Sequence, residues 1–271
     1  MKIAALALGA LALAAPSAQA AENLNAAGAS FPAPIYQKWF QDYAAKTGNQ
    51  VNYQAVGSGA GVRQYKAGTT DFGASDKAVS DKKLAGISRE MVQIPMTGGA
   101  IAVAYNKPGC DLKLSQVELT KVFYGRINNW SQLGCAAGPI TVAVRSDGSG
   151  TTAGFTNSLS AFSPYWAYKV GRGKSVNWPA AGTVGGKGNS GVAGVIKNTP
   201  GAIGYLNYGY VVGDKFQQAA IQNRAGNYVK ANGETSAAGL AQIKLDIKLR
   251  GTDANPAGAN AFPIVSLTWI L

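Results

Sequence analysis

The stretch RSDGSGTT, residues 145–152, separates a strand pattern from a helix pattern. Apolar side chains alternate with other residues over 140–144, which is typical of a half-buried strand. Phe, Leu and Phe then recur on one helical face over 155–162, so we expect a helix to begin near Thr151. The stretch is therefore predicted to turn from a strand into a helix, as connections in α/β folds do.

The same stretch predicts an anion-binding site. The first N–H groups of a helix have no partner within the helix and carry a partial positive charge. Gly150 lets a ligand approach the backbone, Ser149, Thr151 and Thr152 add hydroxyls, and Arg145 adds a forked, charged donor set. The alternative is an ordinary helix cap, which every helix needs. The arginine at the end of the strand favours the anion site.

Three earlier loops strengthen this interpretation. Each follows a strand pattern and is rich in small residues, and together they offer the polar groups of Ser30, Ser58 and Asp76. Strand-like and helix-like patterns alternate along the chain, so the predicted fold class is α/β.

The first helix is predicted to begin at Pro32 and to end at Gly48. Ile35, Trp39 and Tyr43 recur every four residues and are expected to form its buried stripe. The other elements are expected as strands at 51–55, 100–104 and 202–205, as a strand followed by a loop over 70–76, and as helices at 62–67, 115–125 and 192–198.

The composition excludes several kinds of chemistry. The chain has 271 residues, no His and two Cys, so it can form neither a Ser-His-Asp triad nor a His-ligated or four-cysteine metal site. No cofactor or metal is expected. The formal net charge of +12 suggests an anionic partner. The basic residues are scattered rather than clustered, which argues against nucleic-acid binding.

The N-terminus has the features of an export signal. Lys2 precedes an uncharged apolar run over 3–15, and Ala18-Gln19-Ala20 fits a signal peptidase site. The run is shorter than the ~20 residues that a membrane span needs. We therefore expect residues 1–20 to be removed after Ala20 and the chain to be periplasmic.

Export bears on the two cysteines. In an oxidising compartment, Cys110 and Cys135 are expected to form one disulfide. Two buried free thiols are the alternative. The spacing is not C-x-x-C, which argues against a redox-active pair.

At its loops the sequence resembles a known family. The resemblance is to the periplasmic phosphate-binding protein of the high-affinity phosphate ABC transporter, the PstS family, and it runs in order over nearly the whole chain. It is carried by GASFPAP at 28–34, GS at 57–58, DFGASD at 71–76, RSDGSGT at 145–151, GKGNSGV at 186–192 and PGAIGY at 200–205.

The resemblance implies a two-lobed periplasmic binding protein of type II-like architecture, with a hinge and a ligand cleft between the lobes. Lobe 1 would hold residues 21–98 plus about 206–271, and lobe 2 residues 99–205. Asp147 matches a residue that pairs with the arginine. The implied ligand-binding residues are Ala29, Ser30, Phe31, Ser58, Asp76, Arg145, Ser149, Gly150 and Thr151.

The implied function is that of an exported, monomeric, non-enzymatic receptor. It would capture inorganic phosphate and deliver it to the membrane permease subunits of an ABC importer. Two alternatives stay open on the same fold. One is a phosphatase-like enzyme, and the other is a sensor or a binder of another oxyanion.

Asp76 is the candidate for discriminating phosphate from sulfate. Phosphate keeps at least one proton at neutral pH, and a buried carboxylate can accept a hydrogen bond from it. Sulfate has no proton, so it would leave the carboxylate unpaired and repelled.

The last strand-like segment, residues 262–271, ends the chain without a cap or tail. Members of the family continue into terminal helices, so we expect a truncated sequence. A naturally smaller lobe 1 is the alternative.

Overall fold

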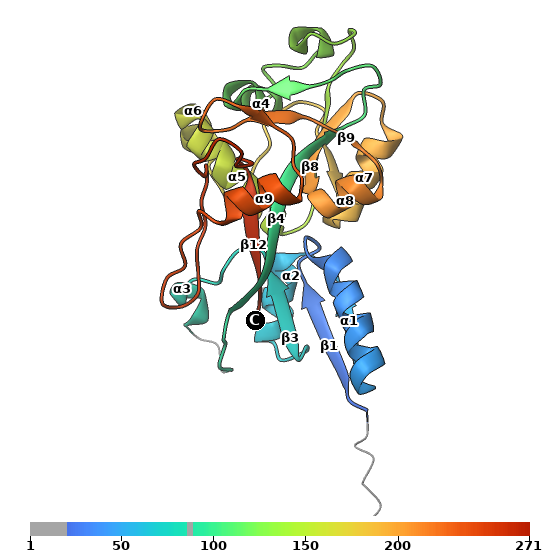
Figure 1. The fold of residues 1–271 in the computed structure, drawn as a ribbon, viewed down its shortest axis with the longest axis vertical. Coiled ribbons are helices and arrows are strands. Elements are labelled where there is room, and N and C mark those ends of the chain that lie inside the picture. The colour runs from blue at the N-terminus through green and yellow to red at the C-terminus, as the bar shows by residue number, and fades with distance from the viewer. Residues whose placement is uncertain (1–20, 86–88) are drawn as a thin grey trace, which may run out of the picture.

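A computed structural model describes residues 21–85 and 89–271, and it has the predicted two-lobed α/β fold (Figure 1). The expected signal peptide, residues 1–20, lies outside the described residues. None of the helices in the described ranges has the length and apolar content that crossing a bilayer requires.

The helices are α1 (Ala33–Thr47), α2 (Ser58–Lys66), α3 (Asp81–Leu84), α4 (Gln116–Tyr124), the 3-10 helix η1 (Trp130–Leu133), α5 (Gly150–Phe162), α6 (Pro164–Lys169), α7 (Gly188–Asn198), α8 (Tyr208–Gly213) and α9 (Gly233–Leu240). The strands are β1 (Asn23–Gly28), β2 (Gln50–Gln54), β3 (Phe72–Ser75), β4 (Ile94–Tyr105), β5 (Lys113–Leu114), β6 (Thr141–Arg145), β7 (Val184–Gly186), β8 (Ala202–Asn207), β9 (Gln217–Gln218), β10 (Ala220–Gln222), β11 (Tyr228–Val229) and β12 (Val265–Ile270).

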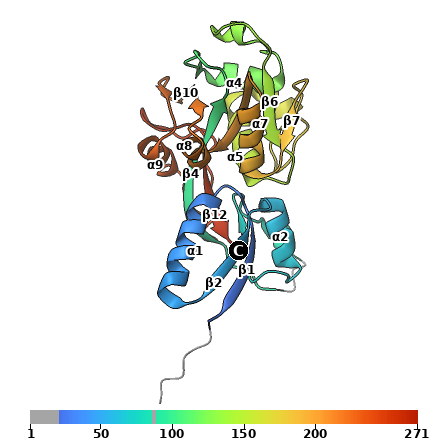
Figure 2. The ribbon, with the colours of Figure 1, turned by 90° about the vertical axis from the view of Figure 1, so that its right-hand side faces the viewer.

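Strands β4 and β12 connect the two lobes (Figures 1 and 2). The long sheet has the order β2-β1-β3-β12-β4-β8-β6-β7. The first half of β4 pairs with β12 up to Ala100, and the second half pairs with β8 from Ile101. In each lobe the neighbouring strands β2–β1–β3 and β8–β6–β7 run parallel. The carboxyl ends of the parallel strands β1, β3 and β6 therefore lead into loops at the junction of the lobes, where ligands of open α/β sheets bind.

The predicted buried elements of lobe 2 are confirmed. The apolar run at 100–104 is fully buried within β4, and Phe155 and Leu159 of α5 pack in the same core. The ring of Phe155 stacks on that of Tyr205 with centroids 4.4 Å apart. Helix α5 begins at Gly150, one residue before the expected position.

The predicted buried stripe of α1 is wrong. Ile35, Trp39 and Tyr43 are 37–40% exposed, whereas Tyr36 is completely buried and packs on Phe40 with ring centroids 5.5 Å apart. Both sets recur every four residues, so spacing alone could not choose between them. Packing against the sheet selects the face that carries Tyr36. The end of the helix was predicted correctly, with Gly48 in the left-handed region at φ +78°.

Much of the segment between β8 and β12 packs on lobe 2, which differs from the expected division of the chain. Gln218 of β9 pairs with Ala104 of β4, and Ile221 of β10 pairs with Leu114 of β5. The buried ring of Phe262 belongs to the same core. Lys248 and Arg250 reach back to lobe 1, where both pair with Asp81 of α3, and β12 then pairs with β3. The expected assignment of 206–271 to lobe 1 therefore differs from the structure for β9, β10 and Phe262.

The predicted disulfide joins Cys110 to Cys135 within lobe 2, across a separation of 25 residues. We expect the Cys110→Ser/Cys135→Ser double variant to lose about 3 kcal/mol of unfolding free energy, because a crosslink restricts the unfolded chain. Urea unfolding of both proteins measures this loss. Phosphate titration should show unchanged affinity, and equal unfolding midpoints would contradict the stabilising role.

Candidate functional site

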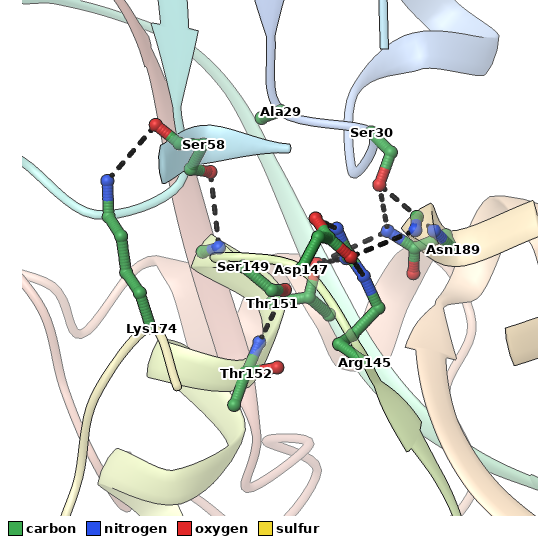
Figure 3. Close-up of polar contacts among 12 residues, drawn as sticks. Ala29, Ser30, Ser58, Arg145, Asp147, Ser149, Thr151, Thr152, Lys174 and Asn189 are labelled. Atoms are coloured by element: carbon green, nitrogen blue, oxygen red, sulfur yellow. Dashed lines mark hydrogen bonds and ion pairs between the residues drawn. The ribbon is translucent and has the colours of Figure 1, made fainter. Parts of the chain in front are cut away.

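Arg145 ends β6 and forms a buried, two-pronged ion pair with Asp147 (Figure 3). Its Nε donates to Asp147 Oδ1 at 2.7 Å and its Nη2 to Oδ2 at 2.5 Å. The two side chains are only 1% and 12% exposed. Burial raises the pKa of Asp147, but hydrogen bonds and the charge of Arg145 outweigh it and hold the pKa below the ordinary value. The pair fixes the guanidinium in one orientation.

The free edge of this guanidinium faces the start of α5. Its Nη1 lies 3.3 Å from the Thr151 hydroxyl. Ser149 caps the helix, since its Oγ accepts from the N–H of Thr152 at 3.0 Å. The cap and the proposed anion site therefore share one turn, and the two interpretations of this stretch are compatible.

Ser58, at the start of α2, brings lobe 1 into contact with that turn. Its Oγ accepts the N–H of Gly150 at 3.2 Å and the N–H of Asp76 at 3.1 Å. Position 150 has no room for a side chain, because a Cβ there would lie 2.5 Å from Ser58 Oγ and 2.6 Å from Asp76. Glycine at this position thus permits the close approach of the lobes.

Asp76 follows β3 and is 5% exposed. Burial raises the pKa of its carboxyl to about 6, while the Thr268 hydroxyl, Arg145, Lys174 and Ser58 oppose the increase. Among the described residues, its Oδ1 has no hydrogen-bond partner of good geometry. A buried acceptor of this kind can receive a proton-bearing ligand atom.

Ser30 joins the site to α7 on the other side of the cleft. Its Oγ accepts from both the backbone N–H and the side-chain Nδ2 of Asn189, each at 3.0 Å. Asn189 Nδ2 also lies 3.2 Å from the Thr151 hydroxyl. We had not predicted Asn189 as a site residue, although it belongs to the glycine-rich segment at 186–192 that resembles the family.

Two tyrosines hold the backbone of the Ser30 loop in place. The Tyr53 hydroxyl donates to the Ala29 carbonyl at 2.6 Å, and the Tyr210 hydroxyl donates to the Ser30 carbonyl at 2.7 Å. Phe31 is 2% exposed and its ring packs in the main core of the molecule. This loop can therefore offer the N–H groups of Ser30 and Phe31 in a fixed arrangement, while the Ala29 N–H donates to the Ala74 carbonyl at 3.0 Å.

Lys174 is a second residue that the sequence did not single out. From the loop after α6 in lobe 2, its Nζ reaches the Ser58 carbonyl of lobe 1 at 3.3 Å (Figure 3). The same Nζ lies 3.0 Å from Ser75 Oγ. Burial lowers the pKa of its ammonium to about 8, although the nearby Asp76 charge favours the protonated form.

The structure brings all the sequence-predicted site residues to one buried region between the lobes. Hydroxyls, a helix start, the Arg145–Asp147 ion pair, the Asp76 carboxylate and the Lys174 ammonium converge there. No group of three or more potential metal ligands gathers within residues 21–85 and 89–271. The arrangement can hold a small oxyanion that carries a proton.

Comparison with known proteins is consistent with this geometry. The sequence model of the PBP superfamily domain matches residues 13–271. The phosphate-binding protein PstS of Pasteurella multocida is 39% identical, over 93% of this chain and 76% of the relative. Its namesake from Haemophilus influenzae is 41% identical, over 94% and 79%.

Solved structures show the same fold. The periplasmic phosphate-binding protein PfluDING, bound with phosphate, superposes with a TM-score of 0.74 at 24% identity, over 92% of this chain and 79% of that one. A putative phosphate ABC transporter substrate-binding protein from Clostridium perfringens gives 0.60 at 20% identity, over 74% and 76%. Because the sequence relatives match over most of their length, the chain belongs to the PstS family of phosphate-binding proteins.

Proposed function

We propose that this protein captures inorganic phosphate in the cleft between its lobes and delivers it to the membrane permease subunits of an ABC importer. The observation that carries the proposal is the pairing of a fixed guanidinium, on Arg145, with a buried acceptor, on Asp76, in one site. A phosphate ion that keeps a proton can satisfy both groups at once. The relatives named above support the same ligand.

Each predicted ligand-binding residue has a role in this proposal. The backbone N–H groups of Ser30, Phe31 and the α5 start donate to phosphate oxygens, as helix starts and loops do in anion sites. Ala29 shapes the loop instead, because its N–H already donates to the Ala74 carbonyl at 3.0 Å. The hydroxyls of Ser30, Ser58, Ser149 and Thr151 add donors. Gly150 N–H and Ser58 Oγ, which bond each other across the closed cleft, can turn to the ligand when the lobes part.

Hinge bending at β4 and β12 would open the cleft, because these strands connect the lobes. We further propose that the protein acts as a monomer in the periplasm, after cleavage at Ala20. The net charge of +12 does not describe the site, where Arg145 and Lys174 are balanced by Asp147 and Asp76. The excess charge is therefore spread over other parts of the chain.

Calorimetric titration with phosphate, arsenate and sulfate tests the proposal. The protein should first be unfolded, freed of phosphate and refolded. Phosphate and arsenate, which both carry a proton near neutral pH, should bind, and sulfate should not. A preference for sulfate would overturn the proposed ligand. Steady hydrolysis of a phosphate monoester would instead support the phosphatase alternative, and normal growth of a deletion strain on limiting phosphate would favour a sensor.

A further inference from the structure

Lys174 is placed to act on both lobes at once. Its backbone carbonyl accepts the N–H of Ser149, the cap of α5, at 2.8 Å. Its side chain crosses the cleft and donates to Ser75 and Ser58, which lie about a hundred residues earlier in the chain. One residue therefore links the helix start in lobe 2 to the loops of lobe 1 that flank Asp76.

We propose that Lys174 is a positioning residue that draws the lobes together and keeps Asp76 ionised, and so sets the pH range in which the site prefers a protonated oxyanion. This inference rests on the proposed function. The ammonium bonds Ser75, the residue before Asp76, and Ser58, whose hydroxyl lies 3.4 Å from Asp76 Oδ2. A positive charge at that place stabilises the carboxylate over the carboxyl form.

The other charged and titratable groups around this pair come from several elements. Arg145 of β6 faces Asp76 and lowers the pKa of its carboxyl. The negative charge of Asp76 in turn raises the pKa of the hydroxyls of Tyr36, Tyr53 and Tyr210. Lys174 is faced by Arg63, Lys77 and Lys83, which disfavour its charge, and by Asp76, which favours it. Arg145 is already paired with Asp147, whereas Lys174 forms no ion pair of its own among the described residues and is one of the cations whose charge lowers the pKa of Asp76.

Substitutions at Lys174 separate its charge from its hydrogen bonds. Lys174→Met removes both, Lys174→Gln keeps a donor without the charge, and Lys174→Arg keeps both. We expect Lys174→Met to weaken phosphate binding near neutral pH by roughly tenfold to a hundredfold, since hydrogen bonds from charged groups have about this effect. Lys174→Gln should recover part of this affinity, and Lys174→Arg most of it.

The decisive readout is the pH profile. Phosphate and sulfate titrations from about pH 5 to about pH 8 should show sulfate rejection failing about one pH unit higher in Lys174→Met and Lys174→Gln than in the wild type. The matched control is Lys169→Met. Lys169 is exposed at the end of α6, and its replacement removes the same charge from the same lobe. That variant should behave as the wild type.

Carboxyl-carbon NMR of Asp76 in the ligand-free protein keeps this inference separate from the proposed function. Its titration midpoint should rise in Lys174→Met and stay unchanged in Lys169→Met. Loss of affinity without any shift of this midpoint would reduce Lys174 to a structural link and overturn the inference. If the wild type binds no phosphate, the proposed function fails, and the NMR midpoint still decides the role of Lys174.

Discussion

Replacing Asp76 with asparagine is expected to abolish the preference for phosphate over sulfate. The carboxylate can accept a hydrogen bond from protonated phosphate, whereas facing sulfate it would be a buried, unpaired negative charge. The asparagine amide can donate to a sulfate oxygen and removes the repulsion. Sites that leave a buried polar group unpaired reject the wrong ligand by about 10⁴-fold or more, so we expect the ratio of the two affinities to change by at least about a hundredfold.

Calorimetric titration of both anions into wild type and Asp76→Asn measures this ratio. Asp214→Asn is the matched control, because Asp214 is exposed at the end of α8 and loses the same charge. Its affinities should equal those of the wild type. Undiminished sulfate rejection by Asp76→Asn would show that another group discriminates the anions.

The same carboxyl predicts a pH dependence of selectivity. Burial raises the pKa of Asp76 to about 6, so it is ionised at neutral pH and becomes protonated as the pH falls through about 6. A protonated Asp76 donates a hydrogen bond instead of accepting one, and sulfate rejection should then decline. The wild type should reject sulfate fully above about pH 7.

The raised pKa of Asp76 also predicts how the stability of the fold depends on pH. The protonated form of Asp76 suits the folded protein better than the ionised form does, so its contribution is present at low pH and is lost as the pH rises from about 4 through about 6. Asp76→Asn should therefore unfold at a higher temperature than the wild type at neutral pH. A stabilising change that destroys selectivity is expected where a functional charge is buried.

The ligand loops were predictable because their residues act locally. A strand followed by glycines and hydroxyls, and then by a helical stripe, specifies where α5 begins, and Ser149 caps that helix. The resemblance then predicted which loops meet, and hydrogen bonds link Ser30, Ser58, Asp76 and Arg145 to the start of α5 and its neighbour Asn189.

The remaining site residues could not be predicted, because their roles depend on contacts between distant segments. Asn189 looks like one more polar residue in a glycine-rich loop until Ser30 is placed opposite it. Lys174 has a role only when the lobes close and put Ser75 within 3.0 Å. The sequence also could not predict on which lobe the segment between β8 and β12 packs, because a chain near a hinge can pass to either lobe.

Replacing Arg145 with methionine should have the other large effect, a loss of phosphate affinity of about 10² to 10³-fold or more. The guanidinium is buried, and removing it takes away a charged donor near Thr151. It also leaves the Asp147 carboxylate with the Gly188 N–H as its remaining partner from outside its own turn, at 3.0 Å. Breaking a buried ion pair in this way costs about 3–5 kcal/mol, because one charge stays behind uncompensated.

The double variant Arg145→Met/Asp147→Asn separates these two effects. It removes the stranded carboxylate, so it should regain most of the stability that Arg145→Met loses, as measured by urea unfolding. It should regain only part of the phosphate affinity, because the guanidinium is still absent. Arg145→Lys keeps the charge but cannot bond both oxygens of Asp147. Its phosphate affinity should therefore lie between those of Arg145→Met and the wild type. If the double variant bound phosphate as the wild type does, Arg145 would serve only to neutralise Asp147, and the anion would be held by hydroxyls and backbone N–H groups alone.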